Sequence, residues 1–491
     1  MSDIIIRRTR SLCPVCLKTV PAALVRSRRT DGGPGYGGVF LTKVCREHGG
    51  FRVKVWGDRM DLESWISRED PLEDPPDGGA ACDGDCRGCM DRAAGNQDPA
   101  HGQTHGQDSC CVILEVTKNC NLRCTYCFAR GGETCETPSY EELCAAIDVV
   151  AEKGGGPLIQ LTGGEPTLRD DLPDLVRYAR GAGCRYTQIN TNGIRLAEDE
   201  EYVRKLAEAG LDIVFLQFDG TDDGIYRKLR GRDLLETKLR AVSNCDKYRI
   251  GVTLVPTVVR GVNDRELGNI VRKASELFPA VRAVHFQPVT YLGRYPGKID
   301  LDTGDACGAP GTDGTPGKDG RSGTSGGRYT LDELMADLCE QTGIPENSLL
   351  PSRCDHAMCE FHSTFLVNNK RQLIPLTDRL QDVRRGRTDA ARNRQYVAEH
   401  WGRRKSSSSP DGEYAGLQAP DPELPLVNLE RERLDFDEFV RRMKTHTLKI
   451  SAMAFQDAMN IDLERLYRCS LHVYEDGRLL PFCAKYMTSA N

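Results

Sequence analysis

The sequence has no long apolar run: none of its segments reaches the ~18 or more consecutive apolar residues from which a membrane-crossing helix is built. We therefore expect no membrane span, so that any contact with a membrane would be peripheral. The first residues, MSDIIIRRTRSLCP, also lack the longer apolar stretch of a secretory signal peptide. Together these absences favour a cytoplasmic protein.

The chain also lacks an excess of basic residues. Its 66 Lys and Arg are outnumbered by 72 Asp and Glu, which gives a formal net charge of -6. Proteins that bind nucleic acid usually present a strongly basic face, so we expect no nucleic-acid partner. The remaining composition, with 39% hydrophobic and 28% charged residues, is typical of a globular protein. A chain of 491 residues has room for about two to four domains.

Cysteine, in contrast, is abundant, with 21 copies. In a small secreted protein so many cysteines would indicate disulfides, but in a long chain without a secretion signal they are more typical of metal sites. Many of them lie two or three residues apart. Such close pairs suit one metal centre better than a bridge between distant segments.

Five parts follow one another along the chain in our interpretation. Strand and helix patterns alternate in the third part, which predicts an α/β fold with a parallel sheet of about six strands. Such a sheet suits a partial (β/α)6 barrel with its chemistry at the carboxyl ends of the strands. The parts are an N-terminal metal module at 1–70, an irregular metal-organised segment at 71–111, the barrel at 112–300, a Gly-rich insert at 301–328, and a C-terminal region at 329–491 with a linker at 403–425.

The Gly-rich insert has a glycine at every third position from Gly308 to Gly326. This period is found in collagen, whose triple helix needs long repeats and three chains. Because the tract is short, we favour a flexible insert over a collagen-like segment.

Three cysteines follow the first predicted barrel strand in C-x3-C-x2-C spacing: Cys120, Cys124 and Cys127. A closed structural site would use four protein ligands, and here the fourth is missing. Three thiolates can hold a [4Fe–4S] cluster by three irons and leave the fourth iron open for an exogenous ligand. The alternatives are a zinc knuckle with a distant fourth cysteine, or buried structural thiols.

The segment CNLRCTYCF, residues 120–128, resembles the cluster motif of the radical S-adenosylmethionine (SAM) superfamily, including the aromatic Tyr126. Further along, TGGEP is similar to the turn with which that family binds the methionine amino group of SAM. In this chain the turn contains Gly163, Gly164 and Glu165. Glycine lets the backbone approach a ligand closely, and a glutamate can accept hydrogen bonds from an ammonium group, so we expect Glu165 to face SAM.

Two later segments, QINTNG and FLQFDG, fall at strand ends where the family contacts the ribose and carboxylate of SAM. The resemblance therefore implies that Asn190, Asn192 and Gln217 bind the cofactor. It also implies that SAM chelates the open iron and that one electron cleaves it to a 5′-deoxyadenosyl radical, which abstracts hydrogen from the substrate. A reductant such as ferredoxin or flavodoxin would supply the electron.

A second C-x3-C-x2-C pattern, formed by Cys82, Cys86 and Cys89, precedes the barrel. With Cys110 or Cys111 as the fourth ligand it would hold a closed auxiliary [4Fe–4S] cluster, and structural zinc is the alternative. The C-terminal region offers two further pairs that can build another auxiliary cluster. These are Cys354 with Cys359, and Cys469 with Cys483.

The N-terminal module contains CPVC and CREHGG, which together offer Cys13, Cys16, Cys45 and His48. This set suits one mononuclear tetrahedral site of rubredoxin or zinc type, although His48 can also be an exposed bystander. The remaining cysteines have no partners at useful spacing, so core packing is their default interpretation. They are Cys135, Cys144, Cys184, Cys245, Cys307 and Cys339.

Three segments together resemble one subgroup of the radical SAM superfamily: SLCPVCLKTVPA, CDGDCRGC, and the closing segment from SAMAFQDAM onward. The subgroup includes archaeal tetraether-lipid synthases and proteins described as hydroxymethyl-dihydropterin methyltransferases. It implies a rubredoxin-like iron and several [4Fe–4S] clusters. Our first interpretation is carbon–carbon bond formation between lipid hydrocarbon chains, which predicts a long apolar tunnel.

Two alternatives stay open. Radical methylation of a small heterocycle such as a reduced pterin predicts a compact polar pocket. A non-catalytic iron–sulfur electron-transfer protein predicts a first cluster that binds no SAM, and the TGGEP turn argues against it.

Overall fold

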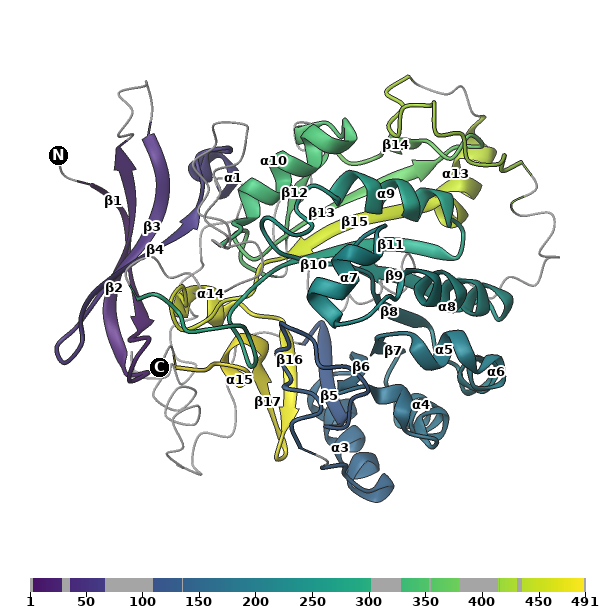
Figure 1. Ribbon diagram of the computed structural model, residues 1–491, viewed down its shortest axis with the longest axis horizontal. Coiled ribbons are helices and arrows are strands. Elements are labelled where there is room, and N and C mark those ends of the chain that lie inside the picture. The colour runs from purple at the N-terminus through teal and green to yellow at the C-terminus, as the bar shows by residue number, and fades with distance from the viewer. Residues whose placement is uncertain are drawn as a thin grey trace.

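The computed structural model describes residues 3–28, 36–66, 109–134, 136–301, 328–352, 355–378, 414, 416–430 and 435–489. Within these ranges no helix combines the length and the apolar character needed to cross a membrane. Two sheets organise the described residues, one of four strands near the N-terminus and one of 13 strands that includes the barrel. Figure 1 shows the smaller sheet on the left, apart from the helices that surround the barrel.

The N-terminal sheet is antiparallel throughout, in the order β1-β2-β3-β4. Its inward side chains, such as Leu41 and Val53, are buried, and Trp56 packs against Trp65 of the following helix. The predicted N-terminal module of short strands is therefore confirmed. Its elements are β1 (Ile4–Leu12), β2 (Thr19–Arg28), β3 (Tyr36–Cys45), β4 (Gly49–Trp56) and α1 (Leu62–Ile66).

Six parallel strands form the open barrel, in the order β5-β6-β7-β8-β9-β11. They are short, almost wholly buried apolar segments, which is typical of strands that are covered on both faces. This confirms the predicted partial (β/α)6 barrel. The strands are β5 (Cys111–Thr117), β6 (Leu158–Gly163), β7 (Tyr186–Thr191), β8 (Ile213–Gln217), β9 (Gly251–Val255) and β11 (Val281–Pro288), with β10 (Thr257–Val258) beside β11.

Helices that connect successive strands cover the outer face of the barrel (Figure 1). The first of them begins at a capping box, in which the side chains of Ser139 and Glu142 each accept a hydrogen bond from the other residue's backbone amide. These crossovers are α3 (Tyr140–Lys153), η1 (Pro166–Leu168), α4 (Leu172–Gly181), α5 (Ile194–Glu198), α6 (Glu200–Ala209), α7 (Asp223–Arg230), α8 (Leu235–Lys247) and α9 (Leu267–Glu276).

The C-terminal region extends both edges of the barrel sheet. Strand β15 pairs parallel to β11 and carries β13 on its other side, whereas β16 pairs parallel to β5 at the opposite edge. The sequence patterns did not predict these additions. The elements are α10 (Leu331–Thr342), η2 (Glu346–Ser348), β12 (Leu350–Pro351), β13 (Glu360–Val367), β14 (Leu373–Pro375), α13 (Phe436–Thr445), β15 (Thr447–Met453), α14 (Leu463–Tyr467), β16 (Leu471–Glu475), β17 (Arg478–Pro481) and α15 (Phe482–Lys485).

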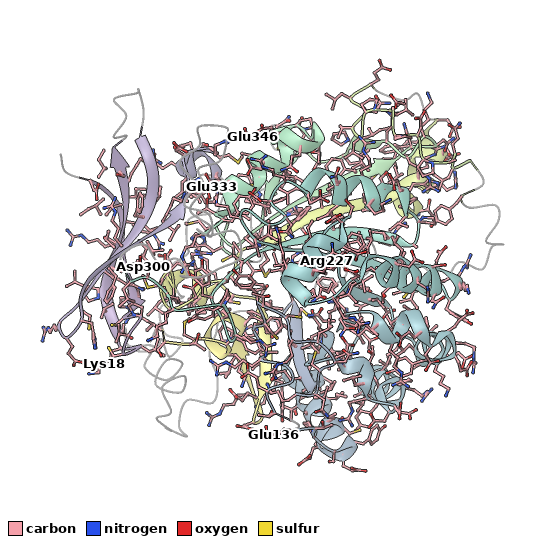
Figure 2. All side chains as sticks on the ribbon, in the orientation of Figure 1. Lys18, Glu136, Arg227, Asp300, Glu333 and Glu346 are labelled. Atoms are coloured by element: carbon pink, nitrogen blue, oxygen red, sulfur yellow. The ribbon has the colours of Figure 1, made fainter. Side chains whose placement is uncertain are left out.

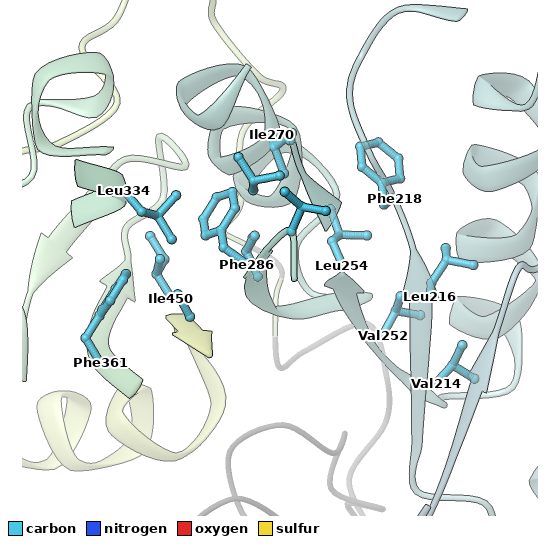
Figure 3. Packing of buried hydrophobic residues seen from close by; sticks show 14 of the residues in the cluster. Val214, Leu216, Phe218, Val252, Leu254, Ile270, Phe286, Leu334, Phe361 and Ile450 are labelled. Atoms are coloured by element: carbon cyan, nitrogen blue, oxygen red, sulfur yellow. The ribbon is translucent and has the colours of Figure 1, made fainter. Parts of the chain in front are cut away.

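One hydrophobic core runs from the barrel into the C-terminal region. Phe286 of β11 lies beside Ile450 of β15, and Leu334 and Phe361 continue the core on the far side of Ile450 (Figure 3). All four side chains are fully buried. Burial of each such side chain contributes about 1.5–3 kcal/mol, so the added strands are part of one folding unit with the barrel.

Buried polar contacts hold the N-terminal sheet against the C-terminal region. Lys43 of β3 donates to the hydroxyl of Ser11 at 3.2 Å and to the carbonyl of Ala458 at 2.7 Å. Burial lowers the pKa of Lys43 to about 7. The segment that follows β11 reaches the same sheet, because Leu301 lines one depression together with Thr42 and Lys43 of β3; Figure 2 labels the neighbouring Asp300.

Candidate active site and metal centres

The residues predicted for the radical site line one cavity at the carboxyl ends of the barrel strands. The cavity encloses about 1050 Å³ of empty space, including its opening to solvent. Its walls come from the loop after β5 and from the ends of β6, β7 and β8. The predicted residues that line it are Cys120, Cys124, Tyr126, Cys127, Gly163, Gly164, Glu165, Asn190, Asn192 and Gln217.

The two glycines of the TGGEP turn pack directly against the chain that leads into the cysteine loop. Gly163 has a φ of +126°, and a Cβ on it would lie 2.1 Å from the carbonyl oxygen of Thr117. A Cβ on Gly164 would lie 2.0 Å from the carbonyl oxygen of Asn119. The backbone amides of Gly164 and Glu165 donate to these same two carbonyls at 2.7 Å. The glycines therefore fix the position of the cysteine loop.

The three loop cysteines are poorly hydrated thiols that face one another. The pKa of Cys120 is raised to about 12, mainly by burial and in smaller part by the negative charges of Glu165, Cys124 and Cys127. Burial likewise raises the pKa of Cys127. Three sulfur donors on one cavity wall fit a [4Fe–4S] cluster held by three thiolates, because iron supplies the positive charge that stabilises the deprotonated thiols.

Glu165 lies at the cavity wall, but its carboxylate is already bound within the chain. Oε1 accepts from the amide and hydroxyl of Thr167 at 3.1 and 2.5 Å, and from the hydroxyl of Thr191 at 2.6 Å. Oε2 accepts from the amide of Asn192 at 2.7 Å. Burial raises the pKa of Glu165, whereas these hydrogen bonds lower it. Glu165 thus ties the end of β6 to the end of β7.

Two buried cations at the cavity, Arg230 in its lining and Lys238 close by, were not predicted from the sequence. Arg230 forms an ion pair with Asp219 at 2.7 and 2.6 Å, and it also donates to the sulfur of Cys124. Lys238 donates to the carbonyl of Asn192, and burial lowers the pKa of Lys238 to about 8. Both cations place positive charge beside the cysteine loop.

Arg294, which follows β11, fastens the same loop from the other side. Its backbone exchanges two hydrogen bonds of 2.9 Å with Cys127. Its guanidinium donates to the carbonyls of Cys124 and Gly131 at 3.0 and 3.3 Å, and pairs with Glu133 at 3.1 Å. No sequence motif marked this arginine, because its contacts come from a segment more than 160 positions away.

An aromatic wall closes the cavity toward the C-terminal region. The rings of Phe455 and Phe482 stack with centroids 4.3 Å apart, and Phe128 meets Phe482 edge-on at 5.1 Å. All three side chains line the cavity.

The C-terminal cysteines meet directly behind this wall. The thiols of Cys359, Cys469 and Cys483 lie close together, because Cys359 and Cys483 both raise the pKa of Cys469 and Cys359 also raises the pKa of Cys483. Burial is the main cause and raises the pKa of Cys483 to about 12. Arg465 donates to the sulfur of Cys359 at 3.3 Å. These donors fit an iron–sulfur cluster in the way the loop cysteines do, and Cys354, the fourth predicted member, lies outside the described residues.

The two cysteines at the start of β5, Cys110 just before it and Cys111 as its first residue, contact different neighbours. The amide of Cys110 donates to the carbonyl of Ser470 at 2.9 Å, which places Cys110 beside the C-terminal cysteines. The thiol of Cys111 instead contacts the amide oxygen of Gln160 at 3.9 Å. Their predicted partners Cys82, Cys86 and Cys89 lie outside the described residues.

The N-terminal sheet brings its four predicted ligands together. The sulfur atoms of Cys13, Cys16 and Cys45 and a ring nitrogen of His48 all lie within 4.8 Å of one another. The hydrogen bond with His48 is the main cause that lowers the pKa of Cys45, to about 6. Three sulfur donors and one nitrogen at this separation fit a single tetrahedral ion, with Zn²⁺ the best match to the mixed donor set.

Comparison with known proteins agrees with this geometry. The family model "Radical SAM superfamily" matches residues 114–274, and "HMPTM N-terminal zinc ribbon domain" matches residues 5–57. The fold and the site thus define a radical SAM enzyme. This excludes the alternative of a non-catalytic iron–sulfur electron-transfer protein. Membership in this class implies a [4Fe–4S] cluster and SAM as cofactors.

Comparison with individual relatives shows the family within this class. The chain is 31% identical to 7,8-dihydro-6-hydroxymethylpterin dimethyltransferase of Methanocaldococcus jannaschii, over 97% of this chain and 92% of that protein. It therefore belongs to the same family within the radical SAM superfamily. Fe-coproporphyrin III synthase of Methanosarcina barkeri is 36% identical over 39% of this chain and 47% of its own length. Streptococcus suis SuiB bound to S-adenosylmethionine is 13% identical over 45% of this chain and 47% of its own, with a TM-score of 0.34.

Proposed function

We propose that this enzyme uses SAM to methylate a reduced pterin by radical chemistry. The observation that carries the proposal is the 31% identity to a pterin dimethyltransferase over 97% of the chain. That likeness extends over the N-terminal sheet, the barrel and the C-terminal region, whereas a match to the barrel alone would indicate only the class. Coupling of lipid chains, our first interpretation, has no comparable support.

We assign the cofactor site as follows. Cys120, Cys124 and Cys127 would hold the cluster, which when bound and reduced would supply the one electron needed to cleave SAM into methionine and a 5′-deoxyadenosyl radical. Glu165 positions the amide of Asn192, whose side chain lies in the same wall as the glycine turn. The remaining contacts to SAM come from Tyr126, Gly163, Gly164, Asn190, Asn192 and Gln217.

The rest of the cavity suits a flat heterocycle. A pterin has two stacking faces and an edge that carries both hydrogen-bond donors and acceptors. Phe455 and Phe482 offer aromatic faces for stacking. The amide of Gln287 at the end of β11 offers one donor group and one acceptor oxygen, which match such an edge.

The other metal sites have supporting roles in this proposal. Cys359, Cys469 and Cys483 hold an auxiliary cluster behind Phe482, with Cys354 or Cys110 as the fourth ligand. Cys82, Cys86 and Cys89 hold a second auxiliary cluster. The N-terminal ion is structural, because its four protein donors leave no open position.

The direct test is turnover with both candidate substrates. Anaerobically reconstituted enzyme, SAM and dithionite would be incubated with 7,8-dihydro-6-hydroxymethylpterin, and in parallel with a lipid that has two hydrocarbon chains. Mass spectrometry should detect a pterin that has gained one or two methyl groups, and unchanged lipid. The Cys120→Ala variant is the control and should give neither product. Carbon–carbon coupled lipid without methylated pterin would contradict the proposal.

A further inference from the structure

A second, open depression lies beside the cysteine loop, on the outer side of Arg294. It encloses about 860 Å³, including open solvent. The cysteine loop, the segment after β11 and the last described residues form its walls. The lining residues are Arg130, Glu133, Gly293, Arg294, Tyr295, Gly297, Lys298, Thr488 and Ser489.

The depression carries a local excess of positive charge. Among the described residues, Arg294 alone of its three cations has a carboxylate partner, Glu133 at 3.1 Å. Arg130 and Lys298 have exposed side chains, and no carboxylate of the described residues lies within ion-pair distance of either. This basic patch stands out on a chain whose formal net charge is -6.

The patch is separated from the proposed cluster by a single layer of backbone. The amide of Arg130 donates to the carbonyl of Cys127 at 3.3 Å, and the amide of Arg294 donates to the same carbonyl at 2.9 Å. Cys127 itself lines the cluster cavity on the other side of this layer. An electron that enters at the patch therefore reaches a cluster ligand without crossing the barrel or the substrate cavity.

We propose that this depression is the docking site for an acidic one-electron carrier protein of the ferredoxin or flavodoxin type. The reduced carrier loses one electron and the cluster gains it. Exposed cations around the entry point attract a negatively charged partner and orient it, which raises the association rate at low ionic strength. The inference rests on the reductive cleavage of SAM in the proposed function, and it does not depend on the pterin.

Charge reversal at the patch tests the proposal. The double variant Arg130→Glu/Lys298→Glu would be compared with Arg185→Glu/Lys205→Glu, which makes the same change in net charge at two exposed cations away from the cysteine loop. Formation of 5′-deoxyadenosine would be measured with a reduced flavodoxin or ferredoxin, at low and high salt, and separately with dithionite. Dithionite is a small reductant that needs no docking surface.

We expect the patch variant to lose roughly tenfold or more of the carrier-dependent rate at low salt, and less at high salt, because salt screens the attraction. The control variant should keep the wild-type rate, and dithionite should support all three proteins equally. Equal carrier-dependent rates in both variants would overturn the proposal. So would a loss that is the same with dithionite, since the two residues would then belong to the cluster site. A wild-type enzyme that cleaves no SAM with dithionite would instead refute the proposed function.

Discussion

Two sets of cysteines in this molecule differ in how their sulfur atoms meet. In the N-terminal sheet three thiols and an imidazole lie within 4.8 Å of one another, and the contact with His48 lowers the pKa of Cys45 to about 6. In the barrel three thiols line a large cavity, and burial raises the pKa of Cys120 to about 12.

The difference shows how one residue type serves two purposes. The N-terminal donors surround a volume that one ion fills, and they leave no position for another ligand. The barrel thiols are too few to close a site, and they face a cavity with room for a cofactor and a substrate. The first arrangement suits a structural metal and the second a reactive one. Variants at the two sites should therefore differ in their effect on SAM cleavage.

The largest effect is expected when the barrel thiols are removed. The variant with Cys120, Cys124 and Cys127 changed to alanine has no ligands for the reactive cluster, so 5′-deoxyadenosine formation should fall to background. The N-terminal site should keep its metal, because its donors belong to another sheet. Product would be measured by chromatography and metal by elemental analysis. Cleavage of SAM by this variant would show that the reactive cluster lies elsewhere.

A smaller effect, a partial loss of SAM affinity, is expected for the variant Glu165→Gln. The new amide places an N–H group against one of the donors that now bind the carboxylate, from Thr167, Thr191 or Asn192. An unsatisfied buried donor costs about 1–3 kcal/mol, and relieving it should displace Asn192 from the cavity wall, so SAM affinity should fall by roughly tenfold. The measurement is the change in the cluster's EPR signal during a titration with SAM. Glu142→Gln on α3 is a remote control. Unchanged affinity would remove Glu165 from the SAM site.

Arg294→Lys should weaken the hydrogen bonds that hold the cysteine loop and so moderately increase the rate of iron loss. Lysine keeps the charge but cannot reach the carbonyls of Cys124 and Gly131 and the carboxylate of Glu133 together. Each lost hydrogen bond contributes about 0.5–1.5 kcal/mol, so iron should leave a few-fold faster in the presence of a chelator. Arg123→Lys is the matched control, because within the described residues the Arg123 guanidinium donates to the carbonyl of Gly132 alone. Equal rates of iron loss in the two variants would contradict a special role for Arg294.

A change at the N-terminal site should act on stability and leave the chemistry intact. Cys16→Ser and Cys45→Ser should each remove about one equivalent of bound metal, because a tetrahedral site rarely survives the loss of a thiolate. The melting temperature should fall, while SAM cleavage at saturating SAM stays within about twofold of wild type per folded molecule. Elemental analysis would measure the bound metal, and differential scanning fluorimetry would measure the melting temperature. Loss of SAM cleavage in the folded variants would show that the N-terminal metal also takes part in the chemistry.

The smallest effect is expected for deletion of residues 308–327, which contain none of the predicted ligands of either site. These residues lie outside the described ranges, and the prediction follows from their Gly-rich composition. A flexible insert costs little for its length, so SAM cleavage and metal content should be unchanged. Loss of folded protein on deletion would show that the tract has a structural role.

The barrel and its site could be predicted because their signals are local. The apolar run CVILEVT became β5 (Cys111–Thr117), and the run before TGGEP became β6 (Leu158–Gly163). Parallel strands bring their carboxyl ends to one edge, so motifs that follow different strands must meet there. The cavity that unites Cys120, Glu165 and Asn190 follows from this rule.

The C-terminal strands and the arginines could not be predicted in the same way. The pairing of Ile450 with Val284 joins strands that are more than 160 positions apart, and nothing in either short apolar run specifies its partner. Arg230 and Arg294 are single residues without a motif. Their roles come from distant partners such as Cys124, and an isolated arginine in a sequence is usually a solvated surface residue.

The placement of the C-terminal strands also sets the order in which the enzyme can be completed during synthesis. The strands β5 to β11 are translated first, but both edges of their sheet stay uncovered until β15 and β16 have left the ribosome. Phe455 and Phe482, which wall the cavity, arrive at the same late stage. A nascent barrel therefore exposes its cysteine loop through a wide opening, which narrows only when the C-terminal region docks. We therefore expect the reactive cluster to be inserted most easily before that step, with assembly of the cluster and docking of the C-terminal region coupled in time.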